Sequence, residues 1–314
     1  MGIPPQGGFL FPSKNLYRKG SGMLNFLGIG DNVCDKYRNR KMMYPGGQAL
    51  NVAVYAHQLG AKAAYMGVFG DDTVAAHVMH TLDELNIDRS HCRQYPGENG
   101  YAVVDFENGD RYFVMSNKGG IVNTHPLVLT DDDILYMKGF DHIHSSENGH
   151  VDELLPQIKT AGVPFSYDFS TRWNKPGGHL DRVAPYIDVA FLSCDTDDQG
   201  VEEIIHLLMS KGCKSVMATR GTRGATFFDG SHLFRQLPHL VEAKDTLGAG
   251  DSFAAAFLMT CTKARKEDPA AFADRSSSYY QSAVRQALED AAAFSAKTCM
   301  VDGAFGFGIP YEEN

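Results

Sequence analysis

Residues 244–253 read KDTLGAGDSF and carry the strongest chemical signal in the sequence. Three small residues, Gly248, Ala249 and Gly250, precede an apolar run that predicts a helix. The first N–H groups of a helix lack partners within the helix, and together with the helix dipole they favour an anion. Asp251 would stand in the first turn, where its carboxylate could accept the proton of a hydroxyl that attacks phosphorus.

A second interpretation explains the same stretch without catalysis. Asp251 would then be a capping acid at the N-terminus of the helix, and the glycines would only permit a turn. The residue types alone fit both interpretations equally well.

Residues 245–251, DTLGAGD, resemble the C-terminal signature of the ribokinase-like (PfkB) kinases, usually DTxGAGD, at every fixed position. The N-terminal signature of that family, two glycines and an asparagine, is matched by residues 46–53, GGQALNVA. The chain is therefore identified as a member of this family. The resemblance implies an ATP-dependent sugar kinase with a ribokinase-like α/β fold and a need for Mg²⁺. It also implies K⁺ near the GAGD loop, where Asp245 and residues 303–306 could contribute carbonyl groups.

The N-terminal signature predicts the sugar site. Gly46 and Gly47 would let a ligand approach the backbone, and the amide of Asn51 offers a donor and an acceptor to a sugar diol. The alternative is a helix N-terminus with a buried, satisfied asparagine. Asp31 resembles the family's sugar-binding acid at the end of the first strand and could accept two hydroxyls, whereas Asp35 fits a solvated or structural acid.

The nucleotide site is predicted from two further stretches. Residues 219–224, TRGTRG, resemble the family's TxGxxG loop, with Thr219, Gly221 and Gly224 at the matching positions. A simple β-turn would explain this loop in isolation, but its place shortly before DTLGAGD favours the nucleotide loop. The family's NxxE motif, which helps to order Mg²⁺, corresponds to a stretch that starts at Ser193 and lacks the asparagine, so we assign no metal ligand.

Within the family, the chain most resembles fructoselysine 6-kinase and related kinases of amino-acid-linked sugars. The stretches that carry this likeness are residues 28–32, 46–55, 167–173 and 296–298. They imply transfer of the γ-phosphoryl group of ATP to the C6 hydroxyl of a fructosamine. Fructose-asparagine, fructose, ribose or a nucleoside would use the same phosphate machinery, and a non-catalytic sensor of nucleotide or sugar stays as a further alternative.

Several side chains are open to more than one interpretation. Residues 168–172, DFSTR, resemble the DxNxR element of some sugar kinases, with Ser170 in place of the asparagine. Arg172 could bind a phosphate through two nitrogens or form a surface salt bridge. Candidate contacts to the amino-acid part of a substrate, or alternatively residues of the lid or surface, are Arg111, Tyr112 and Glu147.

The rest of the chain predicts the scaffold that must position these residues. From residue 24 onward, short β-rich runs alternate with helical patterns, which favours one α/β domain with a mostly parallel sheet and helices on both faces. A long polar connection between helices is predicted at 262–281. The expected strands are 25–30, 63–69, 142–145, 165–169, 189–193 and 215–219, and the expected helices include 50–59 and 74–85.

Residues 92–116 interrupt this alternation. The runs 101–106 and 111–116 flank Asn108-Gly109, which is a strong hairpin signal. We expect a small β lid here, whose strands could pair with a second copy of the chain in a homodimer. An inert extension of the sheet is the alternative.

Composition restricts the partners. A net charge of −9 argues against non-specific binding of nucleic acid. The six cysteines show no metal-ligand spacing, which predicts reduced thiols in the cytoplasm. We expect no membrane association, because no apolar run is long enough to span a bilayer. Residues 1–23 lack the apolar segment of a signal peptide and are expected to form a leader or disordered arm.

Overall fold

The structure, a computed structural model, describes residues 22–107 and 110–312, so most of the predicted N-terminal leader lies outside the described residues. Its larger sheet has the strand order β13-β12-β11-β10-β9-β8-β1-β4-β5. The pairs β11–β12 and β12–β13 are antiparallel, and the other described strand pairs of this sheet are parallel. The strands are β1 (Asn25–Gly30), β4 (Lys62–Phe69), β5 (Arg93–Gln94), β8 (His142–Ser146), β9 (Phe165–Asp168), β10 (Val189–Ser193), β11 (Val216–Thr219), β12 (Ala225–Phe228) and β13 (Leu233–Gln236).

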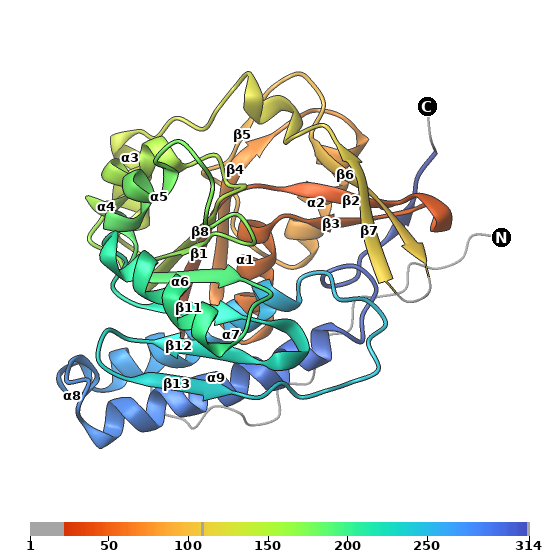
Figure 1. Cartoon of the computed structure of the whole chain (residues 1–314). Helices are drawn as coiled ribbons and strands as arrows, with labels where there is room; N and C mark the ends of the chain where they lie inside the picture. Colours follow the sequence, from red (N-terminus) through yellow and green to blue (C-terminus); the bar gives the residue numbers. More distant parts are fainter. Residues whose placement is uncertain (1–21, 108–109, 313–314) are drawn as a thin grey trace.

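Helices cover both faces of this sheet, as the alternating pattern predicts (Figure 1). A hydrophobic core lies on each face of the sheet, and alternate residues of β1 and β4 point to opposite faces. Phe26 and Tyr65 pack in one core, and Leu27 and Met66 pack in the other. The first face carries α1 (Gln48–Gln58), α2 (Thr73–Glu84), α7 (Ala249–Glu267) and α9 (Ser278–Thr298). The second face carries α3 (Asp131–Met137), α4 (Leu155–Lys159), α5 (His179–Val183) and α6 (Asp198–Ser210). No helix in the described ranges is long and apolar enough to cross a membrane.

The prediction of a long connection at 262–281 is wrong. Helix α7 continues to Glu267, a short helix α8 (Pro269–Ala273) follows, and α9 already begins at Ser278. The segment is amphipathic: Thr262 and Tyr280 are buried, whereas Lys266, Glu267 and Asp268 are exposed.

Some of the helices that surround the sheet are capped by the side chain of their N-cap residue, and others, including α1, α5 and α7, are not. Asp72, Asp197 and Ser277 cap α2, α6 and α9 with their own side chains. Helices α1 and α7 begin instead at Gly47 and Gly248, both with positive φ and neither with a side chain to cap the helix. The N-termini of α1 and α7 are therefore open to other groups.

A second, smaller sheet, which we call the lid sheet, has the order β14-β3-β2-β6-β7. The predicted hairpin strands are confirmed as β6 (Gly100–Glu107) and β7 (Asp110–Ser116), although the Asn108-Gly109 turn lies outside the described residues. The sequence interpretation missed the other three strands, β2 (Val33–Tyr37), β3 (Met42–Gly46) and β14 (Ile309–Pro310). They are short, and two of them contain proline, so their β structure depends on their neighbours: β2 pairs with β6, β3 with β2, and β14 with β3. Figure 1 shows the lid strands on the right, beside the larger sheet.

The lid sheet is joined to the glycine-rich loop before α7 through one buried acid. The hydroxyl of Tyr37 in β2 donates a hydrogen bond to Asp245, and the N–H of Gly303 donates to the same carboxylate at 3.0 Å. The other oxygen of Asp245 accepts the N–H of Leu247 at 3.0 Å. Asp245 therefore ties together three segments that are far apart in the sequence.

The contact between β1 and α1 gives a direct test of the fold. A methyl group at Gly28 would overlap the carbonyl oxygen of Ala49, which belongs to the backbone of α1 and cannot rotate away. We expect Gly28→Ala to lower the free energy of unfolding by about 1–3 kcal/mol, measured by chemical denaturation. Gly22→Ala is the control, because a methyl group there meets open space. Equal stability of the two variants would contradict the described packing of α1 on β1.

Candidate active site

The centre of the candidate site is a hydrogen bond between the first turns of α1 and α7. Nδ2 of Asn51 donates to Oδ2 of Asp251 at 2.7 Å, and both residues are buried. The other amide atom of Asn51, Oδ1, is buried and has no partner in the described part of the chain. The alternative of a fully satisfied asparagine is therefore excluded. A free acceptor next to a carboxylate is suited to a ligand that brings a hydroxyl group.

The carboxyl group of Asp251 lies in a strongly negative and dehydrated place. Burial, and then the charge of Asp168, raises the pKa of Asp251 to about 8, with Asp31 and Asp35 acting in the same direction. The hydrogen bond from Asn51 lowers this pKa and offsets part of the effect. A raised pKa makes the ionised carboxylate a better acceptor for the proton of an alcohol.

Asp31 has a structural task that the sequence interpretation did not foresee. Its carboxylate accepts the N–H groups of Gln48 at 2.7 Å and Ala49 at 3.1 Å, and so caps α1 from outside the helix. Ser146 donates a third hydrogen bond at 3.1 Å. A carboxylate accepts about four hydrogen bonds. Asp31 therefore retains room for about one ligand hydroxyl, rather than the two that we expected.

The paired glycines pack against these acids. A methyl group at Gly47 would lie 2.7 Å from the carbonyl oxygen of Asp31, and one at Gly46 would lie 2.6 Å from Oδ2 of Asp35. Asp35 is buried, which excludes the solvated alternative for this residue. Both glycines are thus needed to bring β3 and α1 close to the carboxylates.

The start of α7 fits an anion site in shape. Gly248 has φ +74°, and a methyl group there would overlap the hydroxyl of Tyr55. Gly250 is exposed, and a methyl group there would meet no atom within 4 Å. Ala249 follows Gly248 as the first residue of the helix. The described structure therefore leaves open space beside Gly250 in the first turn of α7, while the N–H of Ala249 donates to the carbonyl oxygen of Thr246 at 3.3 Å.

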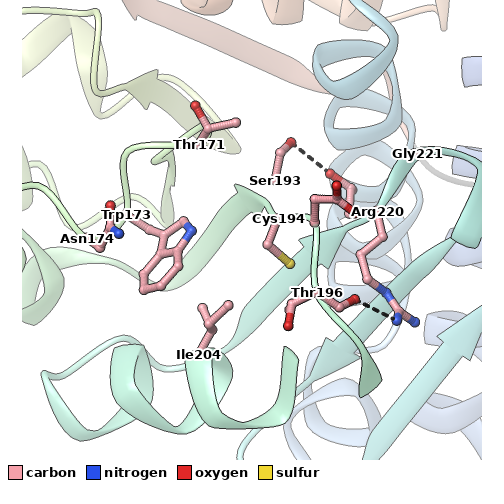
Figure 2. Close-up of a pocket in the computed structure, with 11 residues that line it drawn as sticks. Thr171, Trp173, Asn174, Ser193, Cys194, Thr196, Ile204, Arg220 and Gly221 are labelled. Carbon is pink, nitrogen blue, oxygen red and sulfur yellow. Dashed lines mark hydrogen bonds between the residues drawn. The ribbon is translucent and has the colours of Figure 1, made fainter. Parts of the chain in front are cut away.

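The predicted nucleotide residues lie at a cavity of about 540 Å³ at the carboxyl ends of β10 and β11 (Figure 2). Oγ of Ser193 and Oγ1 of Thr219 lie 3.0 Å apart, and Gly221 is part of the same wall. The opposite wall comes from the loop after β9, including Trp173, which the sequence interpretation did not assign to this site. Gly224 serves packing instead, since φ is +89° and a methyl group would overlap the carbonyl oxygen of Gln236.

The stretch after Ser193, where the NxxE motif would lie, contains acids that already have protein partners. Asp197 caps α6, and Asp198 and Asp195 form ion pairs with Arg220 and Arg223, the first at 2.7 Å. No group of three or more potential metal ligands occurs in the described residues. The described side chains therefore do not form a protein-only magnesium site.

The sequence interpretation missed how many polar residues converge on this edge of the sheet. Asp168 ends β9, and burial raises its pKa to about 6, with Glu147 and Asp31 contributing. Gln48 contacts Asp168 and also accepts a hydrogen bond from Asn148 at 2.8 Å. A signal was present in the sequence, because each of these acids stands at or just after the end of a predicted strand.

A family model described as pfkB family carbohydrate kinase matches residues 29–304. The chain belongs to this family. Solved structures agree on the fold: ribokinase from Giardia lamblia has a TM-score of 0.73 at 15% identity and covers 91% of this chain and 96% of its own. Fructokinase with bound ATP from Xylella fastidiosa has a TM-score of 0.71 at 18% identity and covers 90% of this chain and 94% of its own.

Two curated relatives are more similar in sequence. The chain is 41% identical to fructosamine kinase FrlD of Bacillus subtilis (strain 168) over 293 residues, which is 92% of this chain and 95% of the relative. It is 31% identical to fructoselysine 6-kinase of Escherichia coli (strain K12) over 230 residues, 73% of this chain and 86% of the relative. Membership in the carbohydrate kinase family, expected from the two signatures, is confirmed.

The charges around Asp251 predict a pH dependence. Because its pKa is about 8, kcat/KM for sugar phosphorylation should rise with pH and level off above that value. Asp168→Asn removes the negative charge that is the second cause of the raised pKa of Asp251. The rising part of the plot of kcat/KM against pH should therefore move to lower pH. The measurement is kcat/KM from acid to alkaline pH, with Asp131→Asn on the surface of α3 as control. If the rising part of the pH profile did not move in Asp168→Asn, the charge of Asp168 would not act on Asp251.

Proposed function

We propose that the chain transfers the γ-phosphoryl group of ATP to the C6 hydroxyl of a fructosamine such as fructoselysine. The observation that carries this proposal is the pair formed by Asn51 and Asp251, a buried carboxylate of raised pKa beside an unpartnered amide oxygen. The similarity to fructosamine kinase FrlD and to fructoselysine 6-kinase over most of the chain supports the choice of acceptor.

The sugar would lie between Asp31, Gly47 and Asn51, beneath the lid sheet. Asn51 Oδ1 would accept one sugar hydroxyl, and Asp251 would accept the proton of the hydroxyl that reacts. As the oxygen of that hydroxyl forms its bond to the γ-phosphorus, the bond from phosphorus to the oxygen of ADP breaks. The proton ends on Asp251.

ATP would lie along the cavity wall that contains Ser193, Thr219 and Gly221. This wall is close to Arg220 and Arg223, which form ion pairs with Asp198 and Asp195. Its γ-phosphate would face the N–H groups at the start of α7, from Gly248 to Asp251. These groups are fixed in direction by the helix, so they can stabilise the charge of the transferring phosphoryl group without rearrangement.

The proposal includes two ions, Mg²⁺ bound to ATP and K⁺ near the glycine-rich loop before α7. Mg²⁺ would arrive bound to ATP and neutralise its phosphates. We assign it no protein ligand and derive no step through it. For K⁺, the structure brings the candidate segments at Asp245 and residues 303–306 together, although the Asp245 carboxylate is already held by three protein donors.

The lid sheet supports a proposed homodimer. Edge strand β7 carries four exposed apolar residues, and Phe113 is 64% and Met115 51% exposed. Tyr112 and Val114 are the other two. An apolar edge strand with exposed side chains on both faces is suited to pair with a second copy.

Because the described cysteines are all free, we further propose that the protein works in the reducing cytoplasm.

Acceptor profiling tests the proposed activity. ADP formation from ATP and Mg²⁺ is measured with fructoselysine, fructose-asparagine, fructose, ribose and adenosine. We expect turnover on a fructosamine and a loss of at least about 100-fold in kcat for Asp251→Asn, since the base is removed. ATP binding and thermal unfolding of the variant show whether the fold is intact.

Other outcomes of this profile would change the conclusion in defined ways. Turnover only on a plain sugar or a nucleoside would support kinase activity but refute a fructosamine as the acceptor. If none of the five compounds led to ADP formation, a sensor of nucleotide or sugar would be favoured. Full turnover by Asp251→Asn would refute the catalytic base.

The proposed dimer has its own test. Phe113→Asp and Met115→Asp should shift the protein from dimer to monomer, because each places a charge in the apolar contact. Light scattering coupled to size-exclusion chromatography measures the mass. Leu135→Asp is the matched control, since Leu135 is equally exposed but lies on α3. A wild-type monomer at all concentrations would refute the dimer.

A further inference from the structure

Glu147 and Arg172 form an unequal ion pair close to the proposed sugar site. Nη1 of Arg172 lies 3.3 Å from Oε1 and 3.4 Å from Oε2 of Glu147. The Glu147 side chain is 2% exposed and that of Arg172 is 60% exposed. These are the only side-chain hydrogen bonds of Arg172 to the residues that the structure describes. Because a guanidinium has five N–H donors, Arg172 keeps donors for a ligand.

The segment around Glu147 contacts the residues that begin α1. Ser146 donates to Asp31, and Asn148 donates to Gln48 at 2.8 Å. The N–H of Glu147 itself donates to the carbonyl oxygen of Asp168 at 2.9 Å. Glu147 is thus placed on the same edge of the sheet as the proposed sugar site.

Glu147 is buried in this region, whereas Arg172 and Lys175 are exposed. Burial raises the pKa of Glu147, while Arg172, Lys175 and His179 lower it. Asp168 links the two parts of the site, because its charge acts on Asp251 and the charge of Glu147 acts on Asp168. A ligand that bears an ammonium group and a carboxylate would match both sets of charges.

The loop after β9 separates this pair from the nucleotide cavity. Thr171, Trp173 and Asn174 line that cavity, as Figure 2 shows, whereas Arg172 between them does not. Arg172 lies instead against Glu147. The phosphate-binding interpretation of Arg172 is therefore disfavoured by its position.

We infer that Glu147 and Arg172 form a subsite for the charged amine part of the substrate. Glu147 binds the secondary ammonium group at C1 of the sugar, and Arg172 binds a carboxylate carried by that amine. This inference rests on the proposed fructosamine kinase function and adds the residues that distinguish a glycated amino acid from a free sugar. Lys175, exposed in the same loop, strengthens the attraction for the carboxylate.

The first experiment tests Arg172 with two acceptors of similar shape, the fructose adducts of glycine and of propylamine. Both carry the secondary ammonium group, but only the glycine adduct carries a carboxylate. The wild type should favour the glycine adduct. Arg172→Met should lower the ratio of kcat/KM for glycine adduct over propylamine adduct by about tenfold, through KM. Lys138→Met, which removes an exposed positive charge at the end of α3, should leave the ratio unchanged.

The second experiment tests Glu147 with the propylamine adduct and fructose. Glu147→Gln keeps the shape of the side chain and removes its charge. The ratio of kcat/KM for the propylamine adduct over fructose should fall by about tenfold. An unchanged ratio would refute the role of Glu147 in binding the ammonium group.

Failure of this inference is distinguishable from failure of the proposed function. The subsite would be refuted if Arg172→Met lowered kcat/KM equally for both adducts. It would also be refuted if the variant raised KM for ATP and not KM for the glycine adduct. In both cases the wild type would still phosphorylate fructosamines. A wild type that phosphorylates fructose or ribose but neither adduct would refute the proposed function and the subsite with it.

Discussion

The candidate site depends on one constraint, which is that the N-termini of α1 and α7 must meet at the carboxyl edge of the larger sheet. The hydrogen bond from Asn51 to Asp251 marks this meeting point, and the two residues are 200 positions apart in the sequence. Both helices begin at glycines with positive φ, so neither start is filled by a side-chain cap. Asp31 accepts the first two N–H groups of α1, whereas open space lies beside Gly250 in the first turn of α7.

Gathering several carboxylates at this point has a cost in stability. Since the pKa of Asp251 is raised to about 8, the folded chain binds its proton more tightly than the unfolded chain, in which an aspartate has a pKa of about 3.9. The stability from this group is therefore full below that lower pKa and falls as the pH rises toward 8. The fold tolerates this loss because the large cores on both faces of the sheet hold the helices in place. In the proposed function, the chemical benefit is a buried carboxylate of raised pKa that can act as the base.

Much of the architecture follows from local patterns. Helices α1 and α2 and strands such as β4 and β8 lie within a few residues of their predicted bounds, because apolar periodicity reports which face of an element is buried. The lid strands β2 and β3 could not be found in this way, since each has only five residues and its β structure depends on pairing with neighbouring strands. The polar end of α7 was missed for a related reason: its buried face is narrow, and packing against α9 decides its helical state.

The sequence by itself determined the family, because residues 46–53 and 245–251 resemble the two glycine-rich signatures of the ribokinase-like kinases. It also determined which side chains are candidates for the base and the sugar contacts. Only the tertiary structure decided their surroundings: that Asp31 is largely occupied in capping α1, that Asn51 keeps a free oxygen, and that Glu147 lies against Arg172. The physical reason is that hydrogen-bond satisfaction, burial and electrostatic coupling depend on which strand ends become neighbours. Sheet order sets those neighbours, and no local stretch of sequence contains it.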